Sequence, residues 1–352
     1  MIDQDTIKEV FAIAEQRRAD RRRFIKTAAA GIAATGALTA LSACGDDYDE
    51  DTVSTPTPTP TPTSPASSVE MDVLNFALNL EYLEANYYIS SAFGTGLNSL
   101  SMTGTGTQGT VIGGRQVTFT DPTVANYARE IAADENAHVL FLRSQLGSSA
   151  VAMPTINIDG GPSGAFTAAA TAAKIPLVNG GFDPYLNDDT WLLGGMLLSD
   201  VGVTAYKGSA TLIANKVFLE AAAGILAVEA YHSGLIRTLL YSRGIAPATP
   251  IATAANDRTY SNMISDARDS VDGTITQAGP PQLYADDDQG VTQSPADANT
   301  SNIVPSDSNG IVFGRTAANV LNVVYLNKAA VSSGGFFPSG VNGNIKTSNN
   351  NA

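Results

Sequence analysis

The feature that most restricts the fold is a spacing repeated around the only two histidines of this chain. Glu135 precedes His138 by three positions in "DENAH", and Glu229 precedes His232 by three positions in "VEAYH". Residues three apart on a helix lie on one face. Each pair continues an apolar stripe, so both helices are expected to bury a carboxylate beside an imidazole. A buried charge of this kind requires a hydrogen bond, an opposite charge or a metal ion.

Most of the chain's long apolar patterns have helical periodicity. The first such stretch is apolar nearly all round, which is typical of a deeply buried helix. The second has Pro122 near its start and Gly147 at its end, the residues expected at those positions of a helix. The four helices are expected at residues 70–93, 122–147, 188–213 and 215–244.

The connections between these helices indicate how they are arranged. Between the second and third helices lies a crossover, residues 148–187, rich in Gly, Pro and Ala. Loops of this length are uncommon within compact domains, but ferritin-like bundles have one long crossover at this point. Between the first and second helices, residues 94–121 contain Gly113-Gly114 flanked by β-favouring residues, which predicts a small hairpin. We therefore expect a ferritin-like four-helix bundle over residues 70–245.

Two facing Glu-x-x-His helices would supply four ligands to a common metal site. Ferritin-like sites for two iron or two manganese ions use this pattern and add a glutamate from each of the other two helices. On the first helix, Glu81 continues the apolar stripe, and Glu84 faces the same way within about 60°. The third helix contains no glutamate. Three alternatives remain: Asp200 replaces that glutamate, Glu84 compensates for it, or the site holds a single ion.

The ligand types favour iron or manganese, because carboxylate oxygens with one imidazole per ion suit these metals better than a thiolate-preferring metal. We expect two ions per chain. The competing interpretation is that the two pairs are surface or satisfied core polar residues, and a single pair would favour it. Glu130 and Glu220 are expected to be surface residues or helix-end charges. The predicted metal ligands are Glu81, Glu84, Glu135, His138, Glu229 and His232.

The first 69 residues are expected to be an export signal and a tether. "RRRFIK" at residues 21–26 precedes a short apolar run and resembles a twin-arginine export signal. The run ends in "LSAC", which resembles a bacterial lipoprotein box and predicts lipidation of Cys44. A Thr-Pro repeat within residues 45–69 then favours an extended spacer. These features predict an exported protein, periplasmic or on the outer surface, that contacts the membrane through its lipid anchor only.

Charge and motif content exclude several function classes. Residues 1–44 hold seven of the 20 basic and five of the 34 acidic residues, so the rest carries 13 against 29 and a formal charge of −16. Such an acidic surface repels phosphate backbones and argues against nucleic acid as a partner. Cys44 is the only cysteine, so no internal disulfide can form. No P-loop, dinucleotide-binding fingerprint or Ser/His/Asp arrangement is evident.

The wording and order of several segments resemble ferritin-like domain proteins related to plant desiccation-related proteins. The segments are "LNFALNLEYLEANYY", "EIAADENAHVLFLR", "VGVTAYKGSA", "GILAVEAYHSGLIR", "GIVFGRTAANVLNVVY" and "GGFFPSGVNG". The resemblance covers about residues 70–345, and many bacterial members look exported. It implies a ferritin-like bundle with a dinuclear metal centre at the six ligands named above, but no settled reaction.

Residues 246–352 are interpreted as a loop-rich extension that packs on the bundle without being needed for it. Residues 314–328 read as a short amphipathic helix that packs Val320, Leu321 and Val324, and Phe336 and Phe337 are expected to pack in an apolar groove. Asp286-Asp287-Asp288 is expected to be a solvated loop.

Two functions remain. One is an exported metal-binding protein that reacts with dioxygen or peroxide or holds metal, with an unknown redox partner. The other is a stress-related structural or binding protein with a vestigial or structural site, which self-associates or contacts envelope polymers.

Overall fold

A computed structural model describes residues 67–244, 257–273, 288–294 and 297–351. The expected signal at residues 1–44, with Cys44, lies outside the described residues, as does almost all of the expected linker at 45–69. Among the helices that the structure describes, none combines the length and the apolar character needed to span a bilayer.

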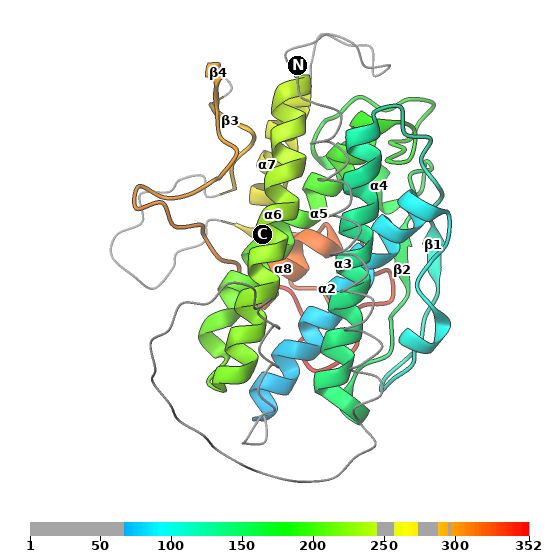
Figure 1. Ribbon diagram of the computed structural model, residues 1–352, viewed down its shortest axis with the longest axis vertical. Coiled ribbons are helices and arrows are strands. Elements are labelled where there is room, and N and C mark those ends of the chain that lie inside the picture. Colours follow the sequence, from blue (N-terminus) through cyan, green and yellow to red (C-terminus); the bar gives the residue numbers. More distant parts are fainter. Residues whose placement is uncertain (1–66, 245–256, 274–287, 295–296, 352) are drawn as a thin grey trace, which may run out of the picture. The chain divides into compact units, whose positions relative to one another are not determined.

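Four long helices form the body of the described chain (Figure 1). Helix α2 packs along α3, and α5 packs along α6. The all-α class and the helical bundle predicted from the sequence are therefore confirmed. The four helices are α2 (Ser68–Phe93), α3 (Pro122–Leu146), α5 (Asp188–Ser209) and α6 (Lys216–Arg243).

Local sequence signals fix the ends of these helices. Ser67 and Glu70 form a capping box at the start of α2. The other oxygen of Glu70 accepts hydrogen bonds from the backbone N–H of Ala214 (2.9 Å) and Asn215 (2.6 Å). These residues join the 3-10 turn η4 (Ala210–Leu212) to α6. One carboxylate therefore links the start of the first bundle helix to the start of the fourth.

Helices α2 and α5 are buried around nearly their whole circumference, whereas α3 and α6 each keep an exposed face. Aromatic side chains fill the space between the two inner helices. The Tyr87 hydroxyl donates to the Trp191 carbonyl (2.7 Å), and the Trp191 indole donates to Ser91 Oγ (2.9 Å). Burying these polar groups with partners avoids the cost of unsatisfied donors. The glutamates and histidines that are predicted to bind metal therefore lie in a bundle with a closely packed interior.

The hairpin expected around Gly113-Gly114 is wrong. Strand β1 (Val111–Gly113) pairs in parallel with β2 (Ile156–Ile158), which belongs to the crossover. Both glycines have positive φ, and a β-carbon on Gly113 would lie 2.5 Å from the Asp159 α-carbon. The chain then continues along α2, where the Val117 N–H donates to the Ser91 carbonyl. The glycine pair therefore permits a close approach between two loops rather than a tight turn.

The crossover after α3 has structure of its own. It contains the 3-10 turn η3 (Gly147–Ser149), strand β2 and helix α4 (Ala165–Ala172). Another short 3-10 turn, η2 (Ser99–Ser101), lies in the preceding insertion. The crossover covers one side of α2, where Phe166 packs against Tyr87 with ring centroids 5.2 Å apart.

The C-terminal part adds helix α7 (Asp257–Asp272), the antiparallel strands β3 (Thr292–Ser294) and β4 (Asp297–Ser301), and helix α8 (Ala317–Tyr325). The side chains of Val320, Leu321 and Val324 are buried, as predicted, and so are those of Phe336 and Phe337. Helix α7 was not predicted, although Tyr260, Ile264, Ala267 and Val271 recur in its sequence at helical spacing.

An ionic cluster inside the protein ties this C-terminal part to α5 and α6. Arg268 pairs with Asp200 (2.9 Å) and Asp288 (2.6 Å), and Arg237 pairs with Asp200 (2.8 Å). Arg315 pairs with both Asp272 and Asp288. The expected solvated loop is wrong for Asp288, which is buried, whereas residues 286 and 287 lie outside the described ranges. The cluster therefore joins Arg268 of the extension to Asp200 of the bundle.

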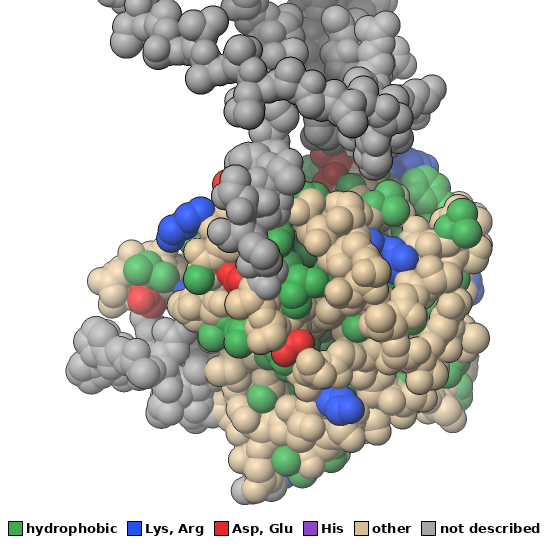
Figure 2. Space-filling model, turned by 90° about the horizontal axis from the view of Figure 1, so that it is seen from below, with side chains coloured by type: hydrophobic (Ala, Val, Ile, Leu, Met, Phe, Trp, Pro, Cys, Tyr) green, Lys and Arg blue, Asp and Glu red, His purple; other side chains and the backbone are tan. Residues whose placement is uncertain are grey.

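Charged side chains are sparse on the face drawn in Figure 2, where uncharged polar side chains and backbone predominate. Lysine and arginine appear singly and form no patch on this face.

Candidate metal centre

The fold brings the two Glu-x-x-His pairs together from α3 and α6. The side chains of Glu135, His138, Glu229 and His232 are all buried. The two imidazole ring centroids lie 6.3 Å apart, with the rings inclined at 35°. Two helices separated by the long crossover therefore present both histidines to one small region, as their spacing predicted.

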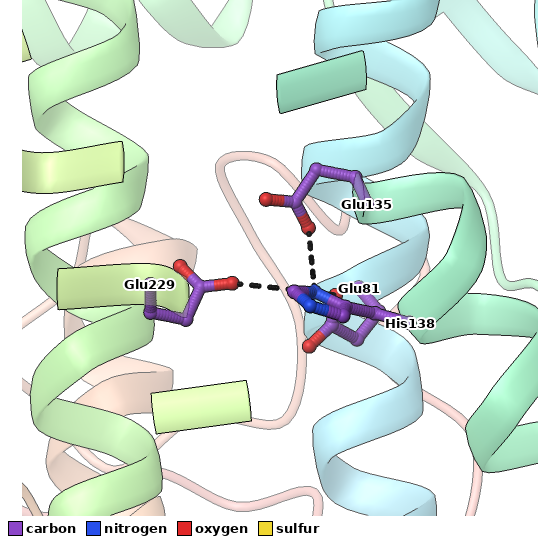
Figure 3. A group of neighbouring side chains, drawn as sticks. All are labelled: Glu81, Glu135, His138 and Glu229. Carbon is purple, nitrogen blue, oxygen red and sulfur yellow. Dashed lines mark hydrogen bonds and ion pairs between the residues drawn. The ribbon is translucent and has the colours of Figure 1, made fainter. Parts of the chain in front are cut away.

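His138 stands at the centre of a group of carboxylates (Figure 3). Its Nδ1 atom lies 3.2 Å from Glu81 Oε2, 3.4 Å from Glu135 Oε2 and 3.6 Å from Glu229 Oε1. Each of these four residues offers a ligand atom within 4.8 Å of the others. Helix α2 thus contributes Glu81, α3 contributes Glu135 and His138, and α6 contributes Glu229.

Glu135 also reaches the second imidazole. Its Oε1 atom lies 3.0 Å from His232 Nδ1, so the two oxygens of this carboxylate face the two histidines. His232 Nε2 lies 3.3 Å from Asp134 Oδ2. Asp134 is partly exposed, with 31% of its side-chain surface accessible, and was missed by the sequence analysis. Its signal was its position directly before Glu135, on the side of α3 that turns toward α6.

Glu84 occupies the space left by the missing glutamate of the third helix. It is buried one turn after Glu81. Opposite it, α5 carries Gly202, where a β-carbon would lie 2.9 Å from Glu84 Oε1 and 2.4 Å from Glu229 Oε2. Any side chain at this position of α5 would displace the carboxylates. The two glutamates of α2 therefore stand beside each other where α5 contributes none.

Asp200 is engaged elsewhere. It accepts hydrogen bonds from Ser233 Oγ (2.6 Å), Arg237 Nη1 (2.8 Å) and Arg268 Nη2 (2.9 Å). A carboxylate with three donors, two of them cationic, has its charge compensated. These partners argue against the alternative in which Asp200 replaces the missing glutamate, and the alternatives with Glu84 or with a single ion remain.

Tyr206 is a second residue that the sequence analysis missed. Its buried hydroxyl donates a hydrogen bond to Glu81 Oε1, which leaves Glu81 Oε2 facing His138. Tyr206 follows Gly202 by one helical turn on α5, so both residues lie on the face turned toward the cluster. Glu130 and Glu220 are exposed, as predicted, and take no part.

Burial and crowding shift the pKa values of these groups in opposite directions. Burial is the main cause that raises the pKa of Glu81 to about 7. Burial, together with repulsion from Glu135, also raises the pKa values of Glu84 and Glu229 well above the ordinary value. Burial opposes ionisation of Glu135 as well, but hydrogen bonds from His138 and His232 lower its pKa.

The same arrangement favours the protonated form of the two imidazoles. Although burial opposes their charge, neighbouring carboxylates raise the pKa of His138 to about 11 and that of His232 to about 9. Without a metal ion, the cluster therefore balances its carboxylates with protons. A bound cation would take over that role, because ligating imidazoles must be neutral and ligating carboxylates ionised.

Unpartnered oxygens show that the residues fit a cation. Among the described residues, Glu84 Oε2, both oxygens of Glu135, both oxygens of Glu229 and His232 Nδ1 are buried without a hydrogen bond of good geometry. Buried polar atoms of this kind are rare and costly in a folded protein. The oxygens of Glu135 and Glu229 lie in one group with Glu81 and His138, an oxygen-rich ligand set that suits a metal ion.

Comparisons with known proteins agree with this geometry. A family model described as a ferritin-like domain matches residues 69–242. The chain is 27% identical over 276 residues to desiccation-related protein PCC13-62 of Craterostigma plantagineum, covering 78% of this chain and 83% of the relative. It is 26% identical over 287 residues to ferritin-like catalase Nec2 of Nesocodon mauritianus, covering 78% and 84%. No solved structure gives a significant match.

Proposed function

Because this chain is a ferritin-like protein of the family that includes desiccation-related proteins, we propose that its buried cluster binds two iron or manganese ions for chemistry on peroxide or dioxygen. The observation that carries the proposal is the set of buried, unpartnered carboxylate oxygens around the two imidazoles. Six residues would hold the metal: Glu81, Glu84, Glu135, His138, Glu229 and His232.

Each ligand has a distinct position in this arrangement. Glu135 faces both imidazoles and would hold metal together with His138 on one side and His232 on the other. Glu81 and Glu84 approach from α2, and Glu229 approaches from α6. Iron or manganese held by these residues would supply redox chemistry toward peroxide or dioxygen.

The surrounding residues hold these ligands in place. Asp134 would accept a hydrogen bond from the Nε2–H group of His232, which would leave Nδ1 of that ring for a metal ion. Tyr206 donates to one oxygen of Glu81 and so orients the other. The closely packed walls of α2 and α5 exclude water from the carboxylates, which strengthens their interaction with a cation.

Among peroxide reactions, disproportionation to water and dioxygen is the first candidate, since one relative is named a ferritin-like catalase. The reaction is balanced without another reductant: two molecules of hydrogen peroxide give two of water and one of dioxygen. We further propose that the protein is exported and anchored at Cys44. The support for this is the N-terminal sequence alone, with its arginine run and "LSAC" ending.

Elemental analysis of the purified protein tests the proposal. We expect two iron or manganese ions per chain, lost in the double variant His138→Ala/His232→Ala and retained in the control Glu130→Gln/Glu220→Gln, whose residues are exposed. The metal-loaded protein should evolve dioxygen from hydrogen peroxide. Metal-free protein whose melting temperature does not change on addition of either metal would contradict the proposal. It would favour the stress-related structural or binding function instead.

A further inference from the structure

An apolar cavity of about 30 Å³ lies between α4, α5, α7 and α8. Its walls are almost entirely carbon, and the charged side chain of Arg268 is the exception. Ala172, at one edge, is exposed, and Leu326 is half-buried, so among the described residues this cavity extends toward the surface. We call it the outer cavity.

A second, smaller cavity of about 10 Å³ lies deeper, between α2, α5 and α8. Its walls are aliphatic or aromatic except at one end, where Glu84 and Gly202 line it. Gly202 is the residue whose missing β-carbon leaves room for the oxygens of Glu84 and Glu229. This inner cavity therefore ends at the carboxylates of the candidate metal centre.

The two cavities meet at two side chains. Leu197 of α5 and Val323 of α8 line both of them. Both residues are buried. A small molecule in the outer cavity would need to displace only this pair to reach the inner one.

Resting on the proposed function, we infer that the outer and inner cavities form a path for dioxygen between the surface and the metal centre. Dioxygen is small and apolar and needs no hydrogen-bond partner. Water or peroxide in such walls would lose its hydrogen bonds, and larger apolar cavities, of about 150 Å³, stay dry and bind xenon. The path serves dioxygen as a product of peroxide disproportionation and equally as an oxidant.

Polar molecules have a different approach available. Asp134 is partly exposed and contacts His232, so hydrophilic groups connect the surface to the cluster at the α3–α6 side. The protein thus offers carbon walls to dioxygen along α5 and α8, and oxygen atoms to metal ions and peroxide at Asp134. This separation makes the inference testable with an apolar probe.

Xenon is the probe for the path itself, because its binding requires no metal. In the full chain with methyl-labelled Leu and Val, xenon should shift the methyl resonances of Leu197, Val323 and Leu83, which line the cavities. Val323→Phe should abolish the shift at Leu83, and Leu197→Ala should enlarge it. The control Leu146→Ala, the same change at a buried position of α3 that lines neither cavity, should leave it unaltered.

The iron-loaded protein tests passage. Oxidation of the ferrous form by dioxygen should slow at least tenfold in Val323→Phe and accelerate in Leu197→Ala, while oxidation by hydrogen peroxide stays unchanged in both. Absence of xenon shifts at Leu83 in the parent protein would overturn the inference, as would unchanged oxidation by dioxygen in Val323→Phe. If that variant does not fold, the enlarging variant decides. Xenon binding in a protein that takes up no metal would refute the proposed function while retaining the path.

Discussion

Gly202 of α5 and Glu229 of α6 are so close that a β-carbon on the glycine would lie 2.4 Å from Glu229 Oε2. Helix α5, the third helix of the bundle, therefore leaves room at Gly202 for carboxylates of the other helices. Glu84, from the first helix, lies against the same empty position, 2.9 Å from that β-carbon. A residue with no side chain thus determines which glutamates can enter the cluster.

Gly202→Ala is expected to reduce metal content, because the new methyl group must push Glu229 and Glu84 away from the ligand positions. Elemental analysis of the purified variant measures this directly. Gly224→Ala on α6 is the matched control, since a β-carbon there meets nothing within 4 Å. That control should keep its metal and gain roughly 1 kcal/mol in free energy of unfolding. Equal metal content in the two variants would contradict the crowding at Gly202.

Asp134→Ala is expected to weaken metal binding by about 10- to 100-fold, the usual effect of removing a partner that orients a ligating histidine. The reason is that His232 would lose the acceptor of its Nε2 proton. Competition with a chelator of known affinity measures the change. Glu130→Ala, also on α3 but exposed, is the control and should bind metal as the parent protein does. An affinity loss shared by both variants would point to a general effect on α3.

Arg268→Ala is expected to lower the free energy of unfolding by about 3–5 kcal/mol, because it removes one cation from buried Asp200 and Asp288. Urea denaturation measures the loss. Arg115→Ala breaks an ion pair whose side chains are 52% and 37% exposed, and it should cost less than about 1 kcal/mol. Similar costs for the two variants would show that the buried cluster does not hold the C-terminal part in place.

Glu70→Gln is expected to lower stability in a pH-dependent way. Backbone hydrogen bonds from Asn215 and Ser67 lower the pKa of Glu70 below its ordinary value of 4.5. The ionised carboxylate therefore stabilises the fold above pH 4.5, and this contribution is lost as pH falls through the lowered pKa. At pH 7 the variant should be less stable by about 1–3 kcal/mol.

The same comparison repeated at lower pH checks the sign. The difference between the parent protein and Glu70→Gln should shrink below pH 4.5, as both side chains become uncharged. Glu220→Gln, an exposed change on α6, should alter stability little at either pH. A difference that grows toward acid pH would contradict the assignment.

The helices and the core of the site were predictable because they depend on periodicity. Glu135 and His138 share a helical face whatever surrounds them, and the crossover length restricts how α3 and α6 meet. The same reasoning placed Glu81 and Glu84 on one side of the first helix. It could not show that Gly202 leaves room for Glu84, because this proximity is a tertiary contact with no local signal.

The parts that were missed depend on contacts between distant segments. Gly113-Gly114 has the composition of a hairpin turn, yet Val111–Gly113 pairs with Ile156–Ile158 because the glycines allow another loop to approach. Helix α7 has an apolar stripe that includes Tyr260 and Ile264, but the core into which this stripe packs is formed by other segments of the chain. From the sequence alone Asp200 could be a metal ligand, because its partners Arg237 and Arg268 come from later in the chain.

The order in which the residues of the ionic cluster are synthesised determines when the cluster can form. Asp200 is made before Arg237, and Arg268 and Arg315 are made later still. A nascent chain that has only its four long helices can pair Asp200 with Arg237 alone. The complete cluster of three arginines and three aspartates can therefore assemble only after Arg315 has been synthesised.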